Sequence, residues 1–513
     1  MAAKYLLGVD IGTYSSKGVL VGSHDGKVHA LHIIEHDLSL PQPRWVEHDA
    51  DQIWWGEFVQ ICQHILGKTG VDPVDILGVG VSGIGPCVLP VDEGGRPLRP
   101  GILYGIDTRA KVEIQTYEDA LGQDAIFQLS GSMLSSSSIG PKIMWIKNHE
   151  PDIYQRARWF LTSHSYIVYR LTGEATVDIY SACSYAPLMD IESITWLDQE
   201  VAGMNPRHAL PKMLWSCEVA GTVTAQAARQ SGLAEGTPVI AGSIDAAAEA
   251  VSAGVSQLGD MMMMFGSSNS LIVRTDGLIR TRQFWGLNWL MPGTYAVVGG
   301  MSTVGSLTRW FRDQFSPLER QAEAQGGEDA YAALMGLLHD SPLGANGLVA
   351  LPYFQGERTP FEDPDARGVL FGLTLKHTRA DVYRALLESV GFGVRHNVDV
   401  MSAQGVEPQR ILGVGGGTKN RAWMQMICDI ANVRMAIPKQ QIGASYGDAL
   451  MAGVGAGVYQ ALDEIQEWIE YGEELQPDPE KHQRYQPLYE IYRQLYEGTK
   501  DLMYRLPQAA RLD

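Results

Sequence analysis

A short pattern that occurs twice constrains the fold of this chain more than any other feature. Residues 5–10 have the composition of a buried strand, 11–16 form a turn of small residues, and 17–22 resemble a return strand. The same order begins again with the strand-like segment 261–265, which is followed by the small polar turn 266–270, built from Gly, Ser and Asn. Strand-like and helix-like segments alternate along the rest of the chain, which is typical of an α/β fold. We therefore expect two similar halves, each with a polar turn at the end of a central strand.

The length of the chain supports this division. At 513 residues and 56.2 kDa it exceeds what one hydrophobic core usually holds. We place the boundary near Gly254, after an Ala-rich helical segment, and predict domains at 1–253 and 254–513. No low-complexity linker separates them, so any relative motion is expected to be a hinge motion. The segment from about Pro477 predicts a terminal helix.

Charge and cysteine content exclude several classes of protein. The formal net charge of −19 argues against a surface for nucleic acid or for an anionic membrane. It does not exclude an anionic ligand, because backbone N–H groups and a metal ion can hold phosphate. The five scattered cysteines predict reduced, buried thiols. We expect a cytoplasmic protein with no signal peptide and no membrane span.

The first polar turn carries the first candidate site. Asp10 ends the strand, and Gly12, Thr13 and Ser15 follow it in the turn. Small residues expose N–H and hydroxyl donors that can surround phosphate oxygens, while the carboxylate can hold a hydrated Mg²⁺. An ordinary hairpin whose glycine relieves backbone strain is the alternative.

A glycine-rich segment, 413–420, lies between a predicted strand and a predicted helix. Glycines at such a junction let a flat ligand or a phosphate approach the backbone. A dinucleotide site is the competing interpretation, but the GxGxxG spacing fails because Thr418 stands three residues after Gly415.

Asp245 stands between a strand and the Ala-rich helix, where an aspartate often serves only as a helix N-cap. Phosphoryl transfer to a hydroxyl group, however, needs a carboxylate near that hydroxyl, a metal ion and phosphate donors. Asp245, Asp10 and the two polar turns supply these parts. We therefore interpret Asp245 as a candidate general base.

Taken together, these motifs resemble the FGGY family of carbohydrate kinases, in the actin-like ATPase superfamily, over nearly the whole chain. Residues 141–151 are similar to a family signature, except that Ile139 stands where Pro, Ser or Thr is preferred, and 356–373 resemble the form found in xylulose kinases. By resemblance, the site residues are Asp10 for the metal; Asp107 and Arg109 for the substrate; Asp245 as base and substrate ligand; and Gly12, Thr13, Ser15, Gly266, Ser267, Gly305, Gly416, Gly417 and Asn420 for the nucleotide.

The resemblance implies two actin-like, ribonuclease-H-like domains that flank an ATP and sugar cleft. It implies that the first domain mainly binds a small sugar and the second mainly binds ATP. Mg²⁺ is the implied metal, and a homodimer is the assembly considered.

Departures from the family pattern leave the sugar open. Gly85 and Pro86 stand where glycerol kinases carry Arg-Glu and xylulose kinases usually carry Met-His, and Ala246 replaces a common amide. We expect the substrate to be a ketopentose such as xylulose. Ribulose, gluconate and a tetritol are the alternative substrates. A non-enzymatic actin-like nucleotide-binding module and a dinucleotide-dependent enzyme are the competing functions.

Overall fold

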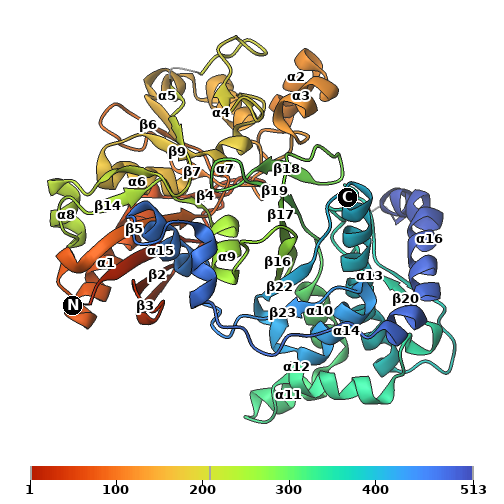
Figure 1. The fold of residues 1–513 in the computed structure, drawn as a ribbon. Helices are drawn as coiled ribbons and strands as arrows, with labels where there is room; N and C mark the ends of the chain where they lie inside the picture. Colours follow the sequence, from red (N-terminus) through yellow and green to blue (C-terminus); the bar gives the residue numbers. More distant parts are fainter. Residues whose placement is uncertain (1–2, 207–208, 511–513) are drawn as a thin grey trace. The chain divides into compact units, whose positions relative to one another are not determined.

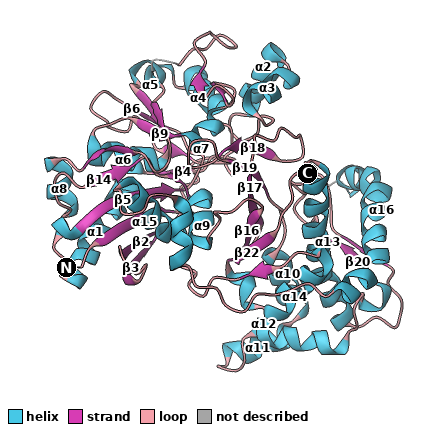
Figure 2. Cartoon of the chain, viewed as in Figure 1, coloured by secondary structure: helices cyan, strands magenta, loops and turns pink. Residues whose placement is uncertain are grey.

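The computed structural model describes residues 3–206 and 209–510, which fall into two compact units. The first unit contains the chain up to Gln257 together with Arg274–Val297 and Gln440–Glu470. The second contains Leu258–Val273, Val298–Lys439 and the chain from Tyr471 onward. Both units combine helices and strands (Figures 1 and 2). The predicted boundary near Gly254 stays a prediction, because the compact units are assembled from interleaved segments.

The main sheet of the first unit has the strand order β13-β14-β5-β1-β2-β3, and β15 also pairs with β5. Its strands are β1 (Tyr5–Ile11), β2 (Ser15–Gly22), β3 (Val28–Glu35), β5 (Ile76–Gly83), β13 (Val219–Thr222), β14 (Pro238–Ile240) and β15 (Ser243–Ile244). β1 and β2 form the antiparallel hairpin that the sequence predicts. β5 runs parallel to β1 and to β15, so the carboxyl ends of these strands meet at one edge. Ligand sites in α/β sheets usually form at such an edge.

A helix covers each face of this sheet. A Cβ atom at Gly18 would collide with Ile61 of α1 (Gly56–Thr69), so α1 packs on the Gly18 face. A Cβ atom at Gly8 would lie 1.9 Å from the Ser445 carbonyl oxygen of α15 (Ala444–Gly455). Figure 1 shows α15, in blue, beside β5. Glycine therefore allows the α15 backbone to touch the strands directly.

This close packing predicts that Gly8→Ala destabilises the first unit strongly. The added methyl group forces α15 away from β1, and such overpacking costs about 3 kcal/mol, equivalent to a loss of roughly 5–10 °C in the unfolding midpoint. Thermal unfolding followed by circular dichroism measures the loss. Gly67→Ala in α1 is the matched control, because nothing lies within 4 Å of its Cβ position; a helical alanine there should stabilise by about 0.5–1 kcal/mol. An unchanged midpoint for Gly8→Ala would contradict the packing.

The first unit also contains a second hydrophobic core, formed largely by residues between Val88 and Leu210. The remaining elements are β4 (Glu47–His48), η1 (Ala50–Trp55), η2 (Pro73–Asp75), β6 (Leu89–Val91), β7 (Gly101–Ile102), α2 (Lys111–Leu121), α3 (Gln123–Ser130), α4 (Ile139–His149), α5 (Pro151–Arg156), β8 (Trp159–Leu161), α6 (Ser163–Thr172), β9 (Thr176–Asp178), α7 (Ile179–Ala182), η3 (Cys183–Tyr185), β10 (Met189–Asp190), β11 (Thr195–Trp196), β12 (Lys212–Leu214), α8 (Ala225–Ser231), α9 (Asp245–Ala253), β18 (Trp285–Asn288) and η8 (Leu462–Trp468). One further strand, β19 (Tyr295–Gly299), begins in the first unit and ends in the second.

The second unit repeats the arrangement of the first. β16 (Asp260–Phe265) forms an antiparallel hairpin with β17 (Asn269–Thr275) and runs parallel to β22 (Arg410–Val414), as β1 does with β2 and β5. The repeated sequence pattern therefore corresponds to a repeated strand topology. The other elements are α10 (Gly305–Phe315), α11 (Pro317–Ala324), α12 (Ala330–Gly336), η5 (Leu337–Asp340), η6 (Ala345–Gly347), β20 (Val349–Leu351), β21 (Val369–Phe371), α13 (Arg379–Ala403), η7 (Gly416–Lys419), α14 (Arg421–Ala431), β23 (Met435–Ala436) and α16 (Pro479–Ala510).

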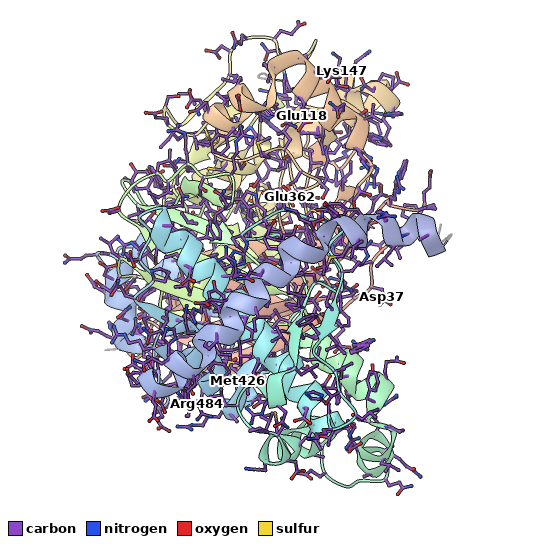
Figure 3. The ribbon with its side chains drawn as sticks, turned by 90° about the vertical axis from the view of Figure 1, so that its right-hand side faces the viewer. Asp37, Glu118, Lys147, Glu362, Met426 and Arg484 are labelled. Carbon is purple, nitrogen blue, oxygen red and sulfur yellow. The ribbon has the colours of Figure 1, made fainter. Side chains whose placement is uncertain are left out.

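Two local predictions, the terminal helix and the buried thiols, are confirmed. The predicted terminal helix is α16, which packs on α14; Figure 3 shows Arg484 of α16 near Met426 of α14. All five cysteines are free and buried. In the part of the chain that the structure describes, no helix is both long enough and apolar enough to cross a membrane.

Candidate active site

Polar side chains gather at the carboxyl edge of the first unit's sheet. Side chains alternate between the faces of a strand, so Asp10 lies on the same face as Gly8, which is covered by α15. Asp10 pairs in register with Ser82 on the parallel strand β5, and Ser82 pairs with Ser243 on β15. Asp245 follows β15 directly. The sheet register thus brings together residues that are far apart in the chain.

Ser82 connects two carboxyl groups. Its hydroxyl oxygen lies 3.0 Å from Asp10 Oδ1 and 2.7 Å from Asp448 Oδ2, and Asp448 comes from α15. Ser82 and Asp448 are fully buried, whereas Asp10 is partly exposed. Sequence interpretation missed both residues. The alternation Gly78-x-Gly80-x-Ser82, with two glycines opposite a helix followed by a polar residue, was the available signal.

Asp245 is the first residue of α9, and the N-cap position belongs to Ile244. Its carboxylate accepts a hydrogen bond from the Ala246 N–H at 2.7 Å. Burial and the nearby charge of Asp10 raise the pKa of Asp245 well above its usual value. A carboxylate with a raised pKa accepts a proton more readily than an ordinary aspartate, which suits a general base.

A further carboxylate, Glu249, lies one turn after Asp245 on α9, at the i+4 position that shares its face. Burial and the charge of Asp10 raise the pKa of Glu249 to about 7, despite the opposing charge of Lys17. Lys17 donates to the Ile442 carbonyl oxygen at 2.8 Å. Sequence interpretation missed Glu249 also, although its spacing from Asp245 was visible.

These raised pKa values predict that the ligand-free protein loses stability as the pH rises. Burial raises the pKa of Asp10 to about 6 and, with the charge of Asp10, that of Glu249 to about 7, above the usual 3.8 and 4.5. Groups whose pKa is higher in the folded state contribute stability that is complete below about pH 4 and is lost by about pH 7. Between pH 5 and pH 8 the parent protein should lose about 2 kcal/mol more of its free energy of unfolding than Glu249→Gln does. Unfolding midpoints at both pH values measure this, and equal pH dependence in both proteins would contradict it.

The residues around Asp10 fit a hydrated Mg²⁺ ion. A carboxylate oxygen is the hard ligand that Mg²⁺ prefers, and Mg²⁺ usually keeps several waters while it is held by one or two carboxylates. Asp10 receives one side-chain hydrogen bond, from Ser82, which leaves carboxylate capacity for an ion. Among the described residues no group of three or more His, Cys, Asp or Glu side chains is arranged to hold a metal. A single carboxylate such as that of Asp10 suits an ion that keeps most of its waters.

The turn that follows Asp10 is closed by its own backbone. The Gly12 N–H donates to the Ser15 carbonyl oxygen at 2.9 Å, and a Cβ atom at Gly12 would lie 2.9 Å from that oxygen. The Gly12 carbonyl oxygen lies 3.2 Å from His36 Nε2. The Thr13 and Tyr104 hydroxyls are 3.4 Å apart. Gly12, Thr13 and Ser15 thus form a compact, partly exposed turn with hydroxyl and N–H donors.

Asp107 and Arg109 are paired with each other and buried. Arg109 Nη2 lies 2.7 Å from Asp107 Oδ2 and 2.8 Å from Glu47 Oε1, and its guanidinium carbon lies 4.1 Å from the Trp45 ring centre. Asp107 Oδ2 also accepts the Val46 N–H. Most of their hydrogen-bonding capacity is therefore used within the protein. Their predicted substrate contacts remain a prediction.

The signature helix α4 supports the same region through Lys142. Its ammonium group is buried and donates to the carbonyl oxygens of Leu103 and Tyr104, the latter at 2.9 Å. Burial lowers the pKa of Lys142 to about 8. Lys142 thus anchors the segment that leads to Asp107.

The second unit holds a cavity of about 780 Å³ at the carboxyl ends of β16 and β22. All the predicted nucleotide residues of this unit line it: Gly266, Ser267, Gly305, Gly416, Gly417 and Asn420. A Cβ atom at Gly305 would lie 2.5 Å from the Gly266 carbonyl oxygen, so glycine is needed where α10 meets the turn. Asn420 caps α14 by accepting the Trp423 N–H at 3.0 Å. Sequence interpretation missed Tyr331 and other lining residues from α12.

The volume of this cavity lies within the range of small-molecule binding sites. Family models for the N-terminal and C-terminal domains of the FGGY carbohydrate kinases match residues 5–252 and 259–456. The chain belongs to the FGGY family of carbohydrate kinases. The actin-like α/β fold class that the sequence predicts is thereby confirmed.

Individual relatives cover almost the whole chain. Xylulose kinase from Staphylococcus xylosus is 27% identical over 502 residues, covering 96% of this chain and 100% of its own. Ribulokinase from Geobacillus thermodenitrificans is 28% identical over 551 residues, covering 99% of this chain and 97% of its own. The crystal structure of xylulose kinase from Rhodospirillum rubrum superposes with a TM-score of 0.89 at 32% identity, covering 98% of this chain and 100% of its own.

Proposed function

We propose that this kinase transfers the γ-phosphoryl group of ATP to a hydroxyl of a ketopentose such as xylulose, with Asp245 as the general base. The observation that carries the proposal is the position of Asp245 at the strand edge beside Asp10, with a raised pKa. A base must lie near both the substrate hydroxyl and the metal-bound phosphate in phosphoryl transfer. The names of the relatives support a ketopentose over other sugars.

Each predicted residue has a role in this proposal. Asp245 accepts the proton of the attacking hydroxyl, and Asp10 holds Mg²⁺ through its carboxylate. Mg²⁺, when bound, neutralises charge on the phosphate oxygens. Thr13 and Ser15 offer donors to the transferred phosphoryl group, Gly12 lets that group approach the turn, and the lining residues of the 780 Å³ cavity hold the nucleotide. Asp107 and Arg109 are proposed to bind the sugar.

The sugar site has an apolar wall beside the base. A Cβ atom at Gly85 would lie 2.6 Å from the Ile244 side chain, so Ile244 fills the space that a larger residue at position 85 would need. Gly85, Pro86 and Ala246 thus stand where other family members are expected to carry polar groups, and Ile244 adds an apolar side chain beside Gly85. We infer that the sugar presents a weakly polar edge there, while ribulose, gluconate and a tetritol remain the alternatives.

A coupled ADP-release assay tests the proposal. Xylulose, ribulose, gluconate and a tetritol are each supplied with ATP and Mg²⁺, and one sugar should raise kcat/KM at least about 100-fold above the others, because lost hydrogen bonds in a sugar site cost several kcal/mol. Tight ATP binding with no sugar-stimulated release would instead favour a non-enzymatic nucleotide-binding module. Binding of a dinucleotide in place of ATP would favour the dinucleotide-dependent alternative. The homodimer and the cytoplasmic location stay predictions.

A further inference from the structure

A buried carboxyl group, Asp448, lies near the proposed metal ligand and has no role in the function described above. Its side chain is fully buried, and its Oδ1 atom has no hydrogen-bond partner among the residues that the structure describes. Burial and the charge of Asp10 raise the pKa of Asp448 well above its usual value. Burying such a group without an ion pair costs stability, and groups retained at that cost often serve function.

The position of Asp448 is determined by backbone contacts on two sides. A Cβ atom at Gly80 of β5 would lie 2.1 Å from the Asp448 carbonyl oxygen. A Cβ atom at Gly447 would lie 1.9 Å from the Ala248 carbonyl oxygen of α9. Close-packed backbones move only at a cost in free energy, so these contacts hold Asp448 at the edge of the sheet. The packing of α15 against β5 and α9 therefore determines the position of Asp448 beside Ser82.

Hydrogen-bond counting shows how Asp448 acts on Asp10. The Ser82 hydroxyl has one proton, but it lies within hydrogen-bonding distance of both carboxyl groups. Both contacts are satisfied together only when one carboxyl group donates to Ser82. With Asp448 as the donor, Ser82 directs its own proton to Asp10 Oδ1. The result is two consecutive hydrogen bonds, in which Asp448 donates to Ser82 and Ser82 donates to Asp10.

We propose that Asp448 is a positioning residue that, through the Ser82 hydroxyl, orients the Asp10 carboxylate for binding of the metal ion. This inference rests on the proposed function, which assigns the metal to Asp10. Ligands held by outer hydrogen bonds bind metal more tightly, and removal of such a partner typically costs 10–100-fold in affinity.

Two substitutions of Asp448 separate a hydrogen-bonding role from a charge role. Asp448→Ala should weaken the apparent Mg²⁺ affinity about tenfold, because Ser82 loses its anchor. Asp448→Asn should stay within about twofold of the parent, because its amide N–H₂ group can donate to Ser82 as the carboxylic acid does. Affinity is measured as the Mg²⁺ concentration that gives half of the thermal shift at saturating ADP, and again as the half-activating Mg²⁺ concentration. The KM for the sugar should not change.

Further variants test whether the effect passes through Ser82. Ser82→Ala should reproduce the loss of Asp448→Ala, and the double variant should be no worse than either single variant. Ser445→Ala is the matched control, because it removes from the same helix a buried hydroxyl that has no hydrogen-bond partner among the described residues. An unchanged Mg²⁺ affinity in folded Asp448→Ala would overturn the proposal, as would an Asn variant as impaired as the Ala variant. Absence of any Mg²⁺ dependence in the parent protein would instead overturn the proposed function.

Discussion

Asp245→Asn should lower kcat by about 10³-fold while the affinity for ATP stays within about twofold. The amide cannot accept the proton of the sugar hydroxyl, and general bases typically contribute 10²–10⁴-fold. Nucleotide binding should persist because the lining of the cavity in the second unit is untouched. Steady-state kinetics and calorimetric titration with ATP measure the two quantities.

The same substitution should raise the thermal stability of the ligand-free protein at pH 8. The pKa of Asp245 is raised because burial and Asp10 disfavour its charge, and the amide removes that charge. Loss of activity with a gain in stability distinguishes a base from a structural residue. Asp49→Asn is the control: Asp49 caps η1 by accepting the Gln52 N–H at 2.9 Å, and asparagine caps equally well. Normal turnover in Asp245→Asn would refute the assignment of the base.

Asp10→Asn should lower kcat about 100-fold at physiological Mg²⁺ and should shift the Mg²⁺ dependence of the reaction to higher concentrations. An amide oxygen binds Mg²⁺ less well than a carboxylate does, because it lacks the negative charge. Higher Mg²⁺ concentrations should recover part of the lost rate, since the ion also binds the phosphates of ATP. The measurement is kcat as a function of Mg²⁺ concentration, at saturating sugar and with ATP kept as its metal complex.

Asp37→Asn is the control for this experiment, because Asp37 is an exposed aspartate of the same unit (Figure 3). Its kinetics should match those of the parent at every Mg²⁺ concentration. If Asp10→Asn lowered the rate equally at all Mg²⁺ concentrations, Asp10 would have a role other than holding the ion. The affinity for the sugar should remain within about twofold in either case.

Local patterns determined most of the framework from the sequence alone. The nearly continuous apolar runs in 5–10 and 261–265 predicted β1 and β16, and the small residues after them predicted the turns. The predicted helices after Asp245 and Asn420 are α9 and α14. These features depend on side-chain periodicity and on the conformations open to glycine, which the chain displays within a few residues.

The partners of the site residues required the tertiary structure. Asp10 and Ser82 become neighbours only through the register of β1 and β5, and Asp448 joins them because glycines let α15 touch both strands. Ile244 beside Gly85 likewise reflects packing and not proximity in the chain.

Asp245 shows the same division. The sequence by itself determined that a carboxylate stands between a strand and a helix, in a family motif that predicts a base. The folded chain was needed to show that Ile244 takes the capping position, and that burial, together with the nearby charges of Asp10 and Glu249, raises the pKa of Asp245. The reason is that electrostatic interactions depend on distance and burial, which are properties of the folded chain and not of spacing along the sequence.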